Sequence, residues 1–279
     1  MTDLAVSVGD FSARLQTLGY RLMRVVDAQG TTLVEYIEPP MCPVVAGSFL
    51  MGTAQKSHAS YRDETPQHSV TLAAFQIGKY PVTIGEYDCA VSAGAVERPQ
   101  EYESERMWEG ELSYPDWPVS GLDWFRATQY ARWMREVTGQ AWSLPSEAQW
   151  EKAARGTHGR LFPWGDERDP ALGTTNDGTS NILTPVGQFP AESASPYGVF
   201  DLVGGVFEWT SSIPTHYPYN PYSRRKDQDS REEPRVMRGG HYGGYSSYVH
   251  AAYRFSDRPY ASNGYYGFRL VLGQDYGEM

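Results

Sequence analysis

The chain has 279 residues, of which 40% are hydrophobic and 14% aromatic, and its 28 glycines and 19 prolines favour a globular body rich in turns. No apolar run approaches the roughly 18 residues that a membrane-spanning helix needs. A net charge of -10 at pH 7 argues against a nucleic-acid surface, because such surfaces are usually basic.

The N-terminal part is predicted to form a helix followed by a hairpin. Asp10 is a plausible N-cap for a short helix, and residues 21–26 and 31–37 read as strands joined by D-A-Q-G. Two prolines then end the unit. We therefore divide the chain into a helix-hairpin appendage, residues 1–40, and a main domain, residues 41–279. The appendage either packs on the main domain or mediates assembly.

The main domain begins with strand-forming strings and continues with helical ones. A short helix is expected after Thr83, because Glu86 stands at the capping-box spacing. The string W-F-R-A-T-Q-Y-A-R-W-M-R-E-V-T has helical periodicity and is ended by Gly139. A further helix, E-A-Q-W-E-K-A-A-R, is capped by Ser146 and ended by Gly156. We interpret the last two helices as structural.

The sequence offers no sign of export. Its first ten residues, M-T-D-L-A-V-S-V-G-D, contain no basic stretch and no long apolar core, so no signal peptide is predicted and a cytoplasmic location is expected. The two cysteines, Cys42 and Cys89, are too few for a disulfide framework. We expect two free thiols in a reducing compartment.

The last part of the chain, residues 235–271, has the most unusual composition. It starts with R-V-M-R-G-G and ends with Y-G-F-R-L-V, which both read as buried strands. Residues 241–266 between them hold seven of the 20 tyrosines and many Ser and Gly. They include no Leu, Ile or Met and one Val, so we expect them to supply little of the core. This is the composition of antibody-type combining surfaces. The alternative is an irregular Tyr-rich loop.

We interpret residues 241–266 as a binding surface held between two rigid strands. The candidate contact residues are the aromatic, small and polar side chains of this segment: Tyr242, Gly243, Gly244, Tyr245, Ser247, Tyr248, Tyr253, Phe255, Ser256, Asp257, Tyr260, Ser262, Asn263, Tyr265 and Tyr266. Arg254 and Arg269 lie closer to the flanking strands and are expected to belong to the scaffold.

Several strings occur together and in order along the main domain. They include G-S-F-L-M-G, L-P-S-E-A-Q-W-E-K-A-A-R-G, F-P-W-G-D, Y-G-V-F-D-L-V-G-G-V-F-E-W-T and R-V-M-R-G-G. This combination resembles the formylglycine-generating enzyme (sulfatase-modifying factor) family. The resemblance implies an α+β, C-type-lectin-like fold with small antiparallel sheets, two main helices and much irregular structure.

The resemblance also implies which enzymatic chemistry to look for. Enzymes of this family oxidise a substrate cysteine with copper held by two cysteines, and the matching positions here are Gly244 and Val249. Neither can bind copper, since Cu(I) needs thiolates. A second enzymatic branch uses a three-histidine iron site, and the six histidines here show no H-x-x-x-H spacing. No catalytic residue is therefore assigned, and no cofactor is required.

A non-enzymatic branch of this family resembles residues 235–271 more closely than the two enzymatic branches do. Variable proteins of diversity-generating retroelements carry a hypervariable ligand-binding segment between R-V-x-R-G-G and G-F-R, and adenine-directed mutagenesis of its codons yields residues such as Tyr, Ser, Gly, Ala and Asn. The resemblance thus implies a variable protein whose partner is an unknown protein or surface ligand, with no nucleic acid and no membrane insertion.

Two alternative functions stay open. One is an oxidase or modifying enzyme of the same fold that lacks the copper-binding cysteine pair. The other is an accessory protein of a larger complex, bound through residues 1–40. A structural calcium ion is also implied by the resemblance, at Asp201, Gly204, Val206 and Glu208, because oxygen ligands suit calcium. The alternative is that Asp201 and Glu208 only bond to local backbone.

Overall fold

The predicted helices begin and end at their capping residues. Helix α4, Trp124–Thr138, starts where the Asp123 side chain accepts from the backbone N–H of Arg126, and it ends at Gly139 with φ 69°. Helix α5, Glu147–Arg155, starts with a capping box in which Ser146 and Gln149 bond to each other's backbone. These two helices confirm the prediction from sequence.

The structure is a computed structural model that describes residues 13–54, 62–100, 109–174, 182–220, 232–245 and 249–273. Asp10, the predicted helix cap, lies outside these residues. The remaining elements, in chain order, are α1 Ala13–Thr17, β1 Arg21–Val26, β2 Thr32–Glu38, β3 Met41–Val44, β4 Gly47–Met51, η2 Arg62–Glu64, β5 His68–Leu72, β6 Phe75–Gly78, α2 Ile84–Ser92, β7 Trp142–Ser143, η4 Ala191–Ser193, β8 Phe207–Trp209, β9 Arg235–Arg238, β10 Phe255–Asp257, β11 Tyr266–Phe268 and β12 Val271–Leu272.

The strands form small sheets rather than one large one. Two four-stranded sheets have the orders β10-β9-β8-β11 and β3-β6-β12-β7, and two-stranded sheets pair β1 with β2 and β4 with β5. All named pairs are antiparallel except β8 with β11, which is parallel. The predicted α+β class is therefore confirmed, with one parallel pair that the sequence did not indicate.

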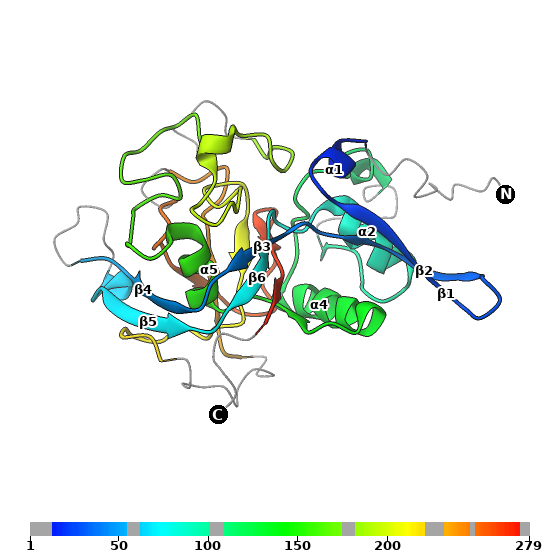
Figure 1. Cartoon of the computed structure of the whole chain (residues 1–279), viewed down its shortest axis with the longest axis horizontal. Helices are drawn as coiled ribbons and strands as arrows, with labels where there is room; N and C mark the ends of the chain where they lie inside the picture. The colour runs from blue at the N-terminus through cyan, green and yellow to red at the C-terminus, as the bar shows by residue number, and fades with distance from the viewer. Residues whose placement is uncertain are drawn as a thin grey trace.

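The helices lie on two sides of the molecule (Figure 1). Helices α2 and α4 lie on the side of the β1–β2 hairpin, and α5 lies on the side of β4 and β5. Two large apolar clusters fill these halves. Trp209, Tyr130 and Phe268 belong to the cluster around α2 and α4, whereas Trp150 and Ile77 belong to the cluster under α5.

The N-terminal hairpin packs on the main domain. Its strands pair as predicted, with Arg21 opposite Glu38 and Val25 opposite Val34. Tyr36 and Ile37 are buried in the same apolar cluster as the residues of α2 and α4. Of the two predicted arrangements, packing on the body is the one present, while a role in assembly stays a prediction. Among the helices in the described ranges, none is both long and apolar enough to cross a bilayer.

Candidate functional site

Buried strands enclose the Tyr-rich segment, as expected. Strand β9 has four buried residues and is followed by Gly239 and Gly240, whose φ angles of 92° and 73° favour glycine. Strand β11 closes the segment and is also buried. Backbone bonds hold both ends: the Tyr242 N–H donates to the Gly205 carbonyl at 2.9 Å, and the Phe207 N–H donates to the Tyr265 carbonyl at 2.7 Å.

A buried arginine fixes the middle of the segment from outside it. The Arg238 guanidinium donates to the carbonyls of Ala252 and Tyr253 at 2.8 and 2.7 Å. It also donates to the Glu151 carboxylate on α5. The charges of Arg238 and Arg155 outweigh the effect of burial and lower the pKa of Glu151. The backbone at 252–253 is thus held by side chains that do not belong to the segment.

Arg254 and Arg269 belong to the scaffold, as predicted from sequence. The Nε and Nη2 atoms of Arg254 donate to the two carboxylate oxygens of Glu147 on α5, at 2.8 and 2.9 Å. Arg269 makes the same kind of paired contact with Glu208, at 2.6 and 2.7 Å. All of these side chains are buried. Two-pronged arginine–carboxylate pairs fix orientation as well as charge, so they hold β10 and the strand after β11 in place.

An aromatic hollow opens between the two ends of the segment. It measures about 350 Å³ and is lined by eight described residues: Phe207, His241, Gly244, Tyr253, Phe255, Asn263, Tyr265 and Tyr266. The ring of Phe207 forms its base, with the rings of Phe255 at 5.0 Å and His241 at 5.2 Å from it. We call this feature the aromatic hollow.

Seven of the candidate contact residues are half-buried, and the first three of them line the hollow: Tyr253, Phe255, Tyr265, Tyr242, Gly243, Asp257 and Ser262. Four more are exposed, namely Tyr245, Ser256, Tyr260 and Asn263. Ser247 and Tyr248 lie outside the described residues. Most of the described candidates are therefore exposed or half-buried, and they lie in the loops at 242–245 and 260–265, at Tyr253 and on β10.

Two candidates belong to the frame rather than to an exposed surface. Gly244 is buried, and Tyr266 is only 7% exposed because its ring packs on Trp209 and Phe207. The Tyr266 hydroxyl donates to Asp257 at 2.8 Å, and burial and this carboxylate raise the pKa of the phenol. Only the side of the Tyr266 ring that lines the hollow is available for contact.

The centre of the segment is more buried than its composition indicated. Val249, His250, Ala251, Ala252 and Arg254 are all buried. Small side chains and one long cation fill this interior, so a segment without Leu, Ile or Met still contributes to the core. This corrects our expectation that residues 241–266 supply little core.

The sequence did not single out Phe207, which forms the base of the hollow. Phe207 lies on β8, about thirty residues before the segment, and the parallel pairing of β8 with β11 brings it there. The apolar string G-V-F-E-W indicates a buried strand. Whether the Phe207 side chain faces the segment depends on the pairing of that strand, which the string does not specify.

The two carboxylates of the predicted calcium site, Asp201 and Glu208, make other contacts in this structure. Both oxygens of Glu208 accept from Arg269, and one also accepts from the Trp150 indole N–H at 2.7 Å. Asp201 accepts from the Gly187 N–H at 2.7 Å, and burial raises its pKa to about 6. A calcium ion at Glu208 would meet the Arg269 guanidinium, so the donor set does not fit a calcium ion in this arrangement. We assign no role to a metal here.

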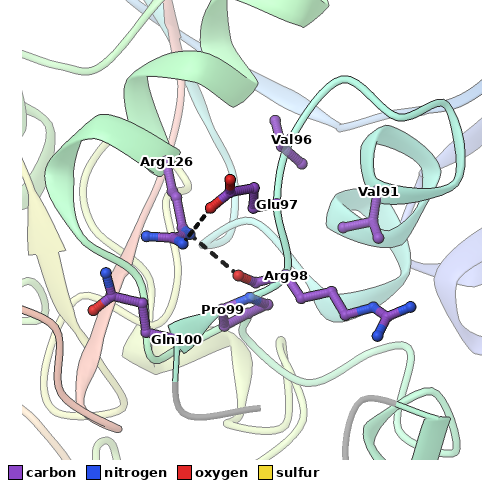
Figure 2. Close-up of a pocket in the computed structure, with 7 residues that line it drawn as sticks. All are labelled: Val91, Val96, Glu97, Arg98, Pro99, Gln100 and Arg126. Carbon is purple, nitrogen blue, oxygen red and sulfur yellow. Dashed lines mark hydrogen bonds and ion pairs between the residues drawn. The ribbon is translucent and has the colours of Figure 1, made fainter. Parts of the chain in front are cut away.

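A second hollow lies near Ser262, whose hydroxyl donates to Gln100 in the lining of this hollow (Figure 2). It measures about 770 Å³ and is lined by residues 91 and 96–100 together with Arg126. Figure 2 shows the Arg126 guanidinium directed at the Glu97 carboxylate and the Arg98 carbonyl. Arg126 also pairs with Asp123 at 2.6 Å. Its charge is thus already matched by two carboxylates.

Comparison with known proteins places the chain in a family. The model of the sulfatase-modifying factor enzyme 1-like domain matches residues 30–273. The chain belongs to this family. The chain is 30% identical over 257 residues to hercynine oxygenase of Mycobacterium tuberculosis, covering 80% of the chain and 58% of that protein. It is 28% identical over 304 residues to the formylglycine-generating enzyme of Bos taurus, covering 90% and 80%.

Another relative is the uncharacterized protein YfmG of Bacillus subtilis, 30% identical over 244 residues. The match covers 76% of this chain and 49% of YfmG, so the chain spans about half the length of that relative.

Solved structures with a similar fold support the lectin-like architecture. PvdO from Pseudomonas aeruginosa matches with a TM-score of 0.67 and 25% identity, over 85% of this chain and 95% of PvdO. Treponema denticola variable protein 1 matches with a TM-score of 0.66 and 18% identity, over 91% of this chain and 99% of that protein. The predicted C-type-lectin-like architecture of formylglycine-generating-enzyme type is thereby confirmed.

Proposed function

We propose that this chain is a ligand-binding variable protein of a diversity-generating retroelement, with residues 241–266 as its hypervariable surface. The proposal is carried by one observation: contacts from outside the segment hold its backbone, while several of its side chains are exposed. Its backbone is held by Arg238 and by Phe207 from outside the segment. Side chains such as Tyr245 and Tyr260, 60% and 51% exposed, are free to change without altering that frame.

Binding would follow from the chemistry of the displayed side chains. Tyrosine provides large contact area with few torsions to freeze, and Ser, Gly and Asn adapt their hydrogen bonds. Aromatic anchors usually carry most of the affinity of such a surface. The partner is proposed to be a protein or another surface ligand, and the fold shared with Treponema denticola variable protein 1 is consistent with this function.

The test is to sequence the gene's neighbourhood and the gene itself across a population. We expect a near-copy of the 3′ segment close to the gene, and substitutions confined to codons 241–266 at template adenines. A locus without such a copy, with substitutions spread evenly along the gene, would contradict the proposal.

The competing function is that of a modifying enzyme, which the names of the relatives favour. Gly244 and Val249 occupy the positions that resemble the copper-binding cysteines, and neither side chain can bind copper. The experiment is to incubate the protein with Cu(I), oxygen and a cysteine-containing peptide and to look for an aldehyde by mass spectrometry. Aldehyde formation above that of the same mixture without the protein would favour the enzyme.

A further inference from the structure

The aromatic hollow is lined almost entirely by rings. Besides Phe207, Phe255 and Tyr253, it has Tyr265 and Tyr266 in its wall. The Tyr265 ring lies 4.1 Å from the His241 ring, with the two planes tilted by 41°. Phe207 and Tyr266 meet edge to face at 6.3 Å. Rings at such different angles line a concave surface, so a planar group in the aromatic hollow can meet both ring faces and ring edges.

The described lining of the aromatic hollow carries no cation, and the buried Arg238 and Arg254 behind it are paired with Glu151 and Glu147. None of the described residues that line it is Lys or Arg. Burial lowers the pKa of His241, so the imidazole is neutral at physiological pH. The Asp257 carboxylate lies behind the Tyr266 hydroxyl at 2.8 Å. The whole chain carries a net charge of -10, which favours the approach of cationic ligands over anionic ones.

Gly243 and Gly244 leave room for the His241 imidazole in the wall of the aromatic hollow. A Cβ at Gly243 would come within 3.3 Å of the His241 ring, and a Cβ at Gly244 within 3.2 Å of the His241 carbonyl. These contacts are tighter than ordinary van der Waals separations. Glycine at both positions therefore lets the imidazole stand against Tyr265.

We propose that the aromatic hollow binds an arginine side chain presented by a protein ligand. A planar guanidinium can stack on one ring while its edge faces others, and it is attracted to the negative faces of aromatic rings. A carboxylate or phosphate group would find no cationic partner in the wall. This inference rests on the proposed function, since it names the ligand chemistry of the same surface.

The test compares three small probes by isothermal titration calorimetry at low salt. The probes are Nα-acetyl-arginine methylamide, its neutral isostere Nα-acetyl-citrulline methylamide, and the apolar Nα-acetyl-norleucine methylamide. We expect the arginine probe to bind about tenfold more tightly than either neutral probe, as several ring contacts to a cation imply. Equal binding of the three probes, or tighter binding of norleucine, overturns the proposal in favour of an apolar site.

A pair of variants then tests whether the rings are responsible. Tyr265→Phe keeps the ring and should retain the arginine preference, whereas Tyr265→Leu should reduce it severalfold. Circular dichroism and thermal melting serve as folding controls, and Tyr265 is only half-buried. An arginine preference that survives Tyr265→Leu unchanged overturns the assignment to this hollow. These failures leave the proposed variable-protein function standing, because sequencing of the locus tests that function separately.

Discussion

Tyrosines of the same segment have different roles according to their burial. Tyr245 and Tyr260 project from the surface, while Tyr266 is 7% exposed and donates to Asp257. The difference comes from position: Tyr266 lies on β11, beside Phe207 on β8, whereas Tyr245 and Tyr260 lie in loops. A displayed residue and a frame residue can therefore share one amino-acid type.

This difference predicts opposite effects on stability. Tyr245→Ala and Tyr260→Ala should change the free energy of unfolding by less than about 0.5 kcal/mol, since exposed substitutions rarely do more. Tyr266→Ala should cost about 3 kcal/mol or more, because it empties a buried ring site. Urea unfolding measures all three, with Tyr266→Phe as a control that keeps the ring and loses only the hydroxyl. A similar cost for Tyr245→Ala would contradict the proposed display role.

A second prediction concerns Glu86, a buried carboxyl group at the start of α2. Burial raises its pKa to about 8, although bonds from Thr83 oppose the shift. The folded protein therefore keeps a proton that the unfolded chain loses near pH 4.5, and stability falls as the pH rises from about 4.5 to 8. Below this range the proton is present in both states, and above it in neither.

The variant Glu86→Gln should remove this part of the pH dependence. We expect its melting temperature to fall less between pH 5 and pH 8 than that of the parent protein. Glu136→Gln on α4, an exposed position, is the matched control and should follow the parent. An unchanged slope in Glu86→Gln would show that another group carries the dependence.

Helix α5 acts as a support under the candidate surface. Its Glu147 pairs with Arg254, and its Glu151 pairs with Arg238 and with Arg155. All five side chains are buried. Helix α5 is itself held by its caps at Ser146 and Gly156. Its ion pairs therefore fix the backbone of the segment 241–266, while the exposed side chains of the segment can vary.

Breaking one of these pairs should be far more costly than removing both partners. Arg254→Met leaves the Glu147 charge buried and unpaired, which costs about 3–5 kcal/mol. The double variant Arg254→Met/Glu147→Met removes both charges and should recover a large part of that loss. Chemical denaturation of the parent, both single variants and the double variant measures the coupling. Additive losses in the double variant would mean that the pair does not act as a unit.

At the level of the whole molecule, the end of the chain runs from one four-stranded sheet to the other, since β11 belongs to the sheet with β8, β9 and β10 and β12 to the sheet with β3, β6 and β7. Strand β12 lies between β6 and β7, and Arg269 just before it reaches Glu208 on β8. The end of the chain is thereby joined to both sheets. Strand pairing makes the first connection, and the buried Arg269–Glu208 ion pair makes the second. The Glu208 carboxylate therefore already has a cationic partner.

Calcium should therefore have no effect on global stability. We expect calcium chloride and a chelator such as EGTA to leave the melting temperature unchanged, because Arg269 already neutralises Glu208. Differential scanning calorimetry measures the shift, with magnesium chloride as the control for ionic strength. A rise in melting temperature specific to calcium would restore the metal site implied by the family resemblance.

The sequence by itself determined the helices, the family and the location of the candidate surface. Capping residues such as Asp123 and Ser146 act on their own neighbours, so their effects can be read locally. The composition of residues 241–266 indicated a surface, because few of its side chains are large and apolar. The scaffold role of Arg254 and Arg269 followed from their closeness to the flanking strands.

Only the tertiary structure decided which residues of that segment face solvent. The parallel pairing of β8 and β11 puts Phe207 under the segment and buries Tyr266. The Arg238 contacts with residues 252–253 bury the middle of the segment. Such contacts join residues far apart in the chain, and their register depends on packing that no local pattern specifies. A short segment rich in Tyr, Ser and Gly is compatible with either burial or display until its neighbours are in place.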